Sequence, residues 1–158
     1  MPLPLLAALI FAFGCFNGLR TLTPAAALCW GAHLGWFSFA HTPFAFLDHP
    51  ASLIIFSLLA IGEWIGDKLP NTPSRVTTFP LISRAVFGGA CGAALATLAG
   101  AGLFVGLVMG AVGAIVGSYA GFLLRRAMTR RGGLPDLPVA LVEDLIAIGG
   151  SFFVASRF

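Results

Sequence analysis

Six long runs of apolar residues, separated by short polar breaks, constrain this chain more than any other feature of its sequence. A membrane-spanning helix needs about 20 predominantly apolar residues. Only 9% of the 158 residues are charged and 58% are hydrophobic, whereas a soluble domain has about 25% charged residues. The chain therefore lacks the polar side chains that cover a soluble surface, and we predict an all-α fold, a polytopic transmembrane helix bundle of about six spans. The runs cover residues 3–19, 23–40, 51–69, 81–100, 102–124 and 139–156.

The chain is short enough to form a single transmembrane domain, residues 1–158. It divides near Pro80 into two halves, 1–79 and 80–158, with three predicted spans each. The last span of each half carries two acidic residues. Because an odd number of spans per half reverses the orientation of the second half, we consider a 3+3 inverted repeat like those of many secondary transporters.

The cations of the sequence gather on one side of this layout. With six spans, the breaks alternate between the two sides of the membrane, and the breaks after the first, third and fifth spans hold seven of the nine Lys and Arg residues. The opposite side holds both termini and only Arg157, while Arg84 lies within the fourth span. Cytoplasmic loops are enriched in Lys and Arg. We therefore expect both termini to be non-cytoplasmic, with the lipid bilayer as the main partner.

Seven polar or charged residues fall within or at the ends of the spans, all in the predicted cytoplasmic half of the bilayer. Ionisable groups at such a depth face a partner or a cavity and are functional candidates by default. Glu63 and Asp67 are four residues apart and share one helix face. Four carboxylates opposite Arg20 and Arg84 give a net negative cavity, which favours a cation or a proton. We predict a substrate- or ion-binding site made of Asn17, Arg20, Glu63, Asp67, Arg84, Glu143 and Asp144.

The same charges also have a structural interpretation. Pairing of Glu63 or Asp67 with Arg84 would fix the register of two helices in a non-transporting membrane scaffold or assembly factor. A third, less favoured interpretation is a membrane enzyme whose carboxylates hold Mg²⁺ beside the polar segment 71–75. The chain has no nucleophile motif, no Cys-x-x-Cys and no phosphate-binding loop. We therefore predict no catalytic residue and no cofactor, and whether the chain binds a metal ion stays open. A nucleic-acid partner is not expected, because no basic stripe is interleaved with aromatic residues.

Glycines recur along the fifth run at intervals of mostly four residues, from Gly102 to Gly121, and Gly88, Gly89 and Gly92 lie in the fourth run. Small residues at this spacing let two helix backbones approach closely within a membrane. The pattern predicts tight packing of the fourth and fifth spans within the chain. The alternative is an interface between copies in a homo-oligomer.

Two short motifs give the chain a resemblance to a known family. Gly18-Leu-Arg20 is followed by a helix that begins with Pro, and Glu63-Trp-Ile-Gly-Asp-Lys-Leu-Pro70 precedes an arginine, Arg84, and a small-residue helix. In these motifs the chain resembles a bacterial multi-pass membrane protein family of the domain-of-unknown-function 4126 type. The resemblance implies a location in the bacterial inner membrane and groups Arg20, Glu63, Asp67, Lys68 and Arg84 without naming their task.

Together these patterns favour a small integral membrane protein that acts as a carrier or channel for a cation, a proton or a small solute. We expect the acidic residues to bind the ion or solute and Arg84 to balance their charge. A homo-oligomer is also expected.

Overall fold

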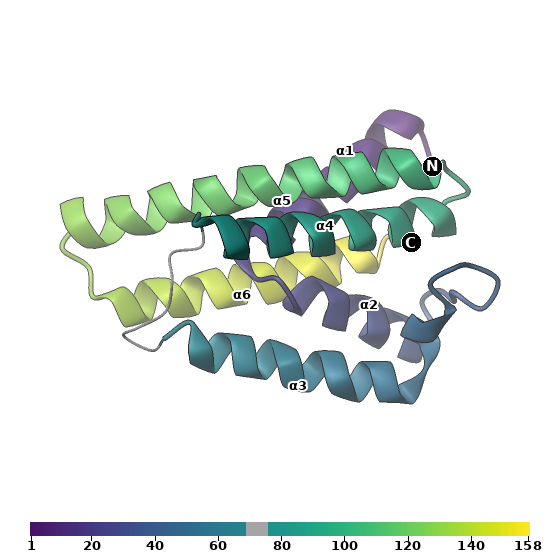
Figure 1. Ribbon diagram of the computed structural model, residues 1–158, viewed down its shortest axis with the longest axis horizontal. Coiled ribbons are helices and arrows are strands. Elements are labelled where there is room, and N and C mark those ends of the chain that lie inside the picture. Colours follow the sequence, from purple (N-terminus) through teal and green to yellow (C-terminus); the bar gives the residue numbers. More distant parts are fainter. Residues whose placement is uncertain (69–75) are drawn as a thin grey trace.

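The computed structural model describes residues 1–68 and 76–158, together with all side chains of these residues except that of Arg131. Consecutive helices run in opposite directions, so both chain ends lie at the same end of the bundle (Figure 1). No strand occurs among the described residues. The predicted all-α helical bundle is confirmed. The helices are α1 (Leu3–Leu19), α2 (Thr23–His33), α3 (Pro50–Gly66), α4 (Thr78–Leu98), α5 (Leu103–Arg126) and α6 (Asp136–Ala155).

Three segments are long and apolar enough to cross a membrane, namely Thr78–Leu98, Leu103–Arg130 and Asp136–Ala155. The apolar helices α1 and α3 are shorter, with 17 residues each. Helix α2 has only 11 residues, which at 1.5 Å per residue is about 16 Å, roughly half of a bilayer core. Figure 1 shows that α2 starts nearer the middle of the bundle than the neighbouring ends of α5 and α6.

The predicted second span, residues 23–40, is wrong in its length, because α2 ends at His33. Gly35 adopts a φ of 75°, in the left-handed region that favours glycine. The Trp36 amide donates to the Gly31 carbonyl over 3.0 Å and the Gly35 amide donates to the Ala32 carbonyl over 3.1 Å, which is the Schellman pattern of a helix end. The chain then forms a loop with a short 3₁₀ turn, Ala45–Asp48.

Helix α5 packs between α1 and α4 through its glycines. A Cβ atom on Gly106 would collide with the backbone of Gly92 in α4, and one on Gly117 would collide with the backbone of Cys15 in α1. Gly110 contacts both neighbours, because a Cβ on Gly14 or on Gly92 would strike its backbone. The predicted packing within the chain is confirmed and extends to α1. These glycine faces are therefore covered by the chain itself and cannot form an interface between copies.

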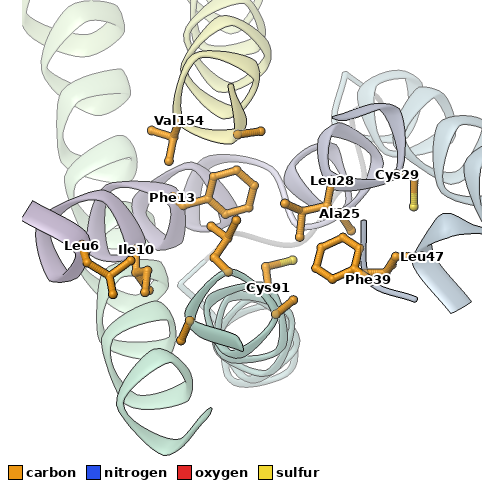
Figure 2. Packing of buried hydrophobic residues seen from close by; sticks show 14 residues of the cluster. Leu6, Ile10, Phe13, Ala25, Leu28, Cys29, Phe39, Leu47, Cys91 and Val154 are labelled. Carbon is orange, nitrogen blue, oxygen red and sulfur yellow. The ribbon is translucent and has the colours of Figure 1, made fainter. Parts of the chain in front are cut away.

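An apolar core joins the helix bundle to the loop that follows α2. Phe13 of α1 lies between Val154 of α6 and Cys91 of α4, and Phe39 and Leu47 of the loop pack beside the α2 side chains (Figure 2). Phe13 and Phe39 are fully buried. This core fixes the positions of α1 and α2, and with them the interruption between the two helices.

Candidate functional site

A buried interruption separates α1 from α2. Helix α1 ends at Leu19 and α2 begins at Thr23, with Pro24 in its first turn. Proline has no backbone N–H and cannot continue a preceding helix. The interruption leaves unpaired carbonyls at the end of α1 and unpaired amides at the start of α2. Arg20 in this turn has no solvent exposure, so these backbone groups require partners from within the protein.

Arg84 of α4 supplies the partners for the end of α1. Its Nη1 atom donates to the Gly18 carbonyl over 2.5 Å and to the Leu19 carbonyl over 2.8 Å. The Ser118 hydroxyl of α5 also donates to the Gly18 carbonyl over 3.2 Å. Because the carbonyl end of a helix carries partial negative charge, the guanidinium stabilises the end of α1 electrostatically as well.

Glu63 of α3 supplies the partners for the start of α2. The amide of Thr21 donates to Oε1 over 2.7 Å, and the amide of Leu22 donates to Oε2 over 2.9 Å. A carboxylate at a helix N-terminus is favourable because the amide end of the helix carries partial positive charge. The Trp64 indole N–H adds a hydrogen bond of 2.9 Å to the Thr23 hydroxyl.

Arg20 forms the centre of the ion pairs between the helices. Its Nη1 donates to Asp67, which directly follows α3, and its Nε donates to Oδ1 of Asp144 in α6 over 2.5 Å. Lys68 binds the second oxygen of Asp144 over 2.8 Å. Arg20 is therefore held by carboxylates from the two halves of the chain.

Arg125, near the end of α5, connects Asp67 with two further acidic residues, Asp136 and Glu143. Its Nη1 lies 3.4 Å from Oδ2 of Asp67 and 3.5 Å from Oε2 of Glu143. Its Nε and Nη2 donate to the two oxygens of Asp136 over 2.8 and 2.6 Å. Lys68 and Arg125 were counted among the cations of the breaks, and their contacts with the acidic residues were not predicted. The family resemblance had grouped Lys68 with Arg20, Glu63, Asp67 and Arg84, whereas the position of Arg125 next to the end of an apolar run is the signal that could have indicated it.

The structure thus brings six of the seven predicted site residues together and adds Lys68 and Arg125. This set holds four cations and four carboxylates, and Arg125 also binds a fifth carboxylate, that of Asp136. The net negative cavity stays a prediction. Pairing of opposite charges lowers the cost of placing ions in a low-dielectric region. We call this set the ionic cluster: Arg20, Glu63, Asp67, Lys68, Arg84, Arg125, Glu143 and Asp144.

Asn17, the seventh predicted residue, lies one turn before Arg20 on α1 and is fully buried. Its Nδ2 donates to the Phe13 carbonyl over 3.2 Å. Its Oδ1 has no hydrogen-bond partner, and neither has Nη2 of the fully buried Arg20, within the part of the chain that the structure describes. Buried polar atoms without a protein partner are commonly satisfied by water or by a ligand.

A metal-binding enzyme site finds no support in the described residues. No group of three or more His, Cys, Asp or Glu residues is arranged there to hold a metal ion. The polar segment 71–75, which the enzyme interpretation needs, lies outside the described residues. That interpretation stays a prediction.

Comparison with known proteins gives a family and no function. No curated protein and no solved structure gives a significant match to the chain. The sequence model of one family, described as "Domain of unknown function (DUF4126)", matches residues 7–156. This match covers nearly the whole chain, including most of α1, all of α2 and every member of the ionic cluster. The protein therefore belongs to the DUF4126 family, as its Gly18-Leu-Arg20 and Glu63-to-Pro70 motifs indicate.

Proposed function

We propose that the protein is a small carrier or channel that moves an ion or small solute across the bacterial inner membrane, with the ionic cluster as its binding or coupling site. The supporting observation is the interruption between α1 and α2, where Arg84 and Glu63 hold the two helix ends. Secondary transporters build their sites from discontinuous helices whose ends meet inside the membrane. Each backbone group that such an interruption frees needs a partner from within the protein, and here ionisable side chains of two other helices supply the partners.

The proposed orientation places the ionic cluster near the cytoplasmic side, with both termini on the other side. Lys68 and Arg125 lie toward the bundle end where α3 and α5 finish, together with the exposed Arg126 and Arg130. Arg157 lies at the opposite end, near the C-terminus. This distribution agrees with the enrichment of Lys and Arg in cytoplasmic loops.

A non-transporting scaffold is the second candidate, and the pairing of every carboxylate in the ionic cluster favours it. Every carboxylate of the cluster has a cation within 4 Å. A fully paired network of this kind can fix the register of the helices without taking part in transport. The two candidates differ in whether removal of one charge changes a flux or only the stability.

The deciding experiment measures flux in proteoliposomes that contain wild-type protein or the Glu63→Gln and Asp67→Asn variants. Currents on a solid-supported membrane after concentration jumps of NaCl, KCl or ammonium chloride report ion movement. Light scattering after jumps of urea or glycerol reports solute movement. Asp48→Asn is the matched control, because Asp48 lies in the loop after α2 and binds Ser38 and the Phe39 amide there.

We expect wild-type protein and Asp48→Asn to show the same flux, and folded Glu63→Gln and Asp67→Asn to show a reduced one. Unchanged flux in both folded cluster variants would show that the ionic cluster is not part of the transport site. If liposomes that contain wild-type protein show the same flux as empty liposomes with all these probes, the result would favour the scaffold.

A further inference from the structure

The C-terminal end of α5 carries two arginines that the ionic cluster does not use, Arg126 and Arg130. Both are exposed, and neither forms an ion pair within the part of the chain that the structure describes. The other arginines with described side chains each contact an acidic residue or an aromatic ring: Arg20, Arg84, Arg125 and Arg157. The guanidinium groups of Arg126 and Arg130 are therefore available to a partner outside the chain.

These two arginines lie where the α5 segment leaves the hydrocarbon of a bilayer. Leu103–Arg130 has 28 residues, which at 1.5 Å per residue is about 42 Å, whereas the hydrocarbon core of a bilayer is about 30 Å thick. Helix α5 continues into a π-turn, Ala127–Arg131, and its end reaches past the adjacent ends of α3 and α4 (Figure 1). A helix of this length extends into the headgroup layer, and its cationic end is the one suited to that layer.

An exposed stripe of apolar side chains on α5 leads to Arg126 and Arg130. Its members recur every three or four residues and so share one helix face: Val105, Val108, Val112, Val116, Tyr119 and Leu123. The stretch from Val112 to Leu123 is about 16 Å long at 1.5 Å per residue, which matches one half of the hydrocarbon core. Arg126 and Arg130 continue the same spacing. This face of α5 is thus apolar over the depth of one leaflet and cationic at its end.

We propose that this face of α5 binds an anionic phospholipid, whose phosphate contacts Arg126 and Arg130 and whose acyl chain lies along the stripe. A guanidinium binds phosphate through two parallel N–H···O hydrogen bonds. Residues four apart are neighbours on a helix surface, so both arginines reach one headgroup. A zwitterionic headgroup would bring its own ammonium beside these cations, and like charges repel, so a headgroup with net negative charge is favoured.

Charge also favours a lipid over a second copy of the chain as the occupant of this face. Asp136, at the start of α6, is bound by Arg125 over 2.6 Å, and an exposed acidic partner for Arg126 and Arg130 is absent from the described residues around them. Two copies that met through this face about a two-fold axis would place the same arginines opposite each other. An anionic lipid supplies both the negative charge and the acyl chain that the face fits.

The test measures lipid binding to the full chain in detergent by native mass spectrometry, with dioleoylphosphatidylglycerol as the anionic probe and dioleoylphosphatidylcholine as the zwitterionic one. We expect wild-type protein to prefer phosphatidylglycerol. Arg126→Gln and Arg130→Gln should each lower phosphatidylglycerol binding by about fivefold, and the double variant by about 25-fold, with phosphatidylcholine binding unchanged. Both positions are exposed, so the melting temperature should not change.

Arg157→Gln is the matched control, because it removes one exposed arginine and the same net charge at the opposite end of the bundle. Its phosphatidylglycerol binding should equal that of wild-type protein. Equal losses in Arg157→Gln and Arg126→Gln would overturn the inference, since the lipid would then respond only to net charge. Wild-type protein without a preference for phosphatidylglycerol would overturn it as well. A lipid-free dimer that dissociates in Arg126→Gln would also overturn it, because the arginines would then contact a second copy.

Discussion

Glu63 and Arg84 hold opposite sides of one interruption in the chain, and Oε1 of Glu63 lies 3.8 Å from Nη2 of Arg84. The carboxylate accepts from the amides of Thr21 and Leu22, and the guanidinium donates to the carbonyls of Gly18 and Leu19. Each ion therefore has the sign that the adjoining helix end favours. Helices α3 and α4 stabilise the interruption between α1 and α2 in this way.

Replacement of Arg84 by Gln should destabilise the fold strongly. The variant leaves the buried carbonyls at the end of α1 with weaker donors and takes a cation away from Glu63. Removal of one partner of a buried pair costs about 3–5 kcal/mol. Denaturant unfolding in detergent micelles would measure the loss. Arg126→Gln is the control at an exposed position, with an expected change within about 0.5 kcal/mol. Equal stability of the two variants would contradict the proposed role of Arg84 in holding α1.

Gly110 should tolerate no side chain, whereas Gly149 should accept one. A Cβ on Gly110 would meet the carbonyl oxygen of Gly88, and nothing lies within 4 Å of the corresponding position at Gly149. Overpacking costs about 1–3 kcal/mol, so Gly110→Ala should lower the free energy of unfolding by that amount. Gly149→Ala lies in the interior of α6 and should raise it, because Ala favours a helix over Gly by up to about 1 kcal/mol. Thermal melts of both variants would show opposite shifts. A raised or unchanged melting temperature for Gly110→Ala would contradict the close packing of α5 against α4.

The helices of this protein could be predicted largely from its apolar runs, with one instructive exception. Five of the six runs become helices near their predicted positions. The run 23–40 forms a helix only as far as His33, because the apolar residues continue past Gly35 while the backbone turns there. Hydropathy alone does not distinguish a helix from a compact apolar loop, and here the local hydrogen bonds of Trp36 and Gly35 end α2.

Most of the candidate site could be predicted from charges within or beside apolar runs, but the ion pairs that Lys68 and Arg125 form could not. Glu63, Arg84 and Glu143 are conspicuous because apolar residues surround them. Lys68 and Arg125 lie at the ends of runs, where a cation usually reaches toward lipid headgroups. Whether such a side chain turns outward or back into the bundle depends on tertiary packing. The four-residue spacing of Glu63 and Asp67 showed their common face but not their partners.

The orientation of the protein can be tested by labelling of single cysteines. Ser156 and Arg126 are exposed and lie at opposite ends of the bundle, whereas the native Cys29 and Cys91 are buried. In intact cells, a membrane-impermeant maleimide should label Ser156→Cys directly and Arg126→Cys only after permeabilisation. Wild-type protein, with Cys15 partly buried, gives the background. Labelling of Arg126→Cys in intact cells would show that the protein has the opposite orientation.

Arg125 and Asp136 should contribute very differently to stability, although they form the same ion pair. The Asp136 side chain is 64% exposed and that of Arg125 is 18% exposed. Loss of an exposed acidic partner changes stability by about 1 kcal/mol or less, so Asp136→Asn should remain close to wild type. Arg125→Gln also takes the cation from Asp67 and Glu143, and leaving part-buried groups unsatisfied costs about 1–3 kcal/mol. Chemical unfolding of the two single variants and the double variant would separate these effects. If Arg125→Gln had no larger effect than Asp136→Asn, Arg125 would act only at the surface and would not belong to the ionic cluster.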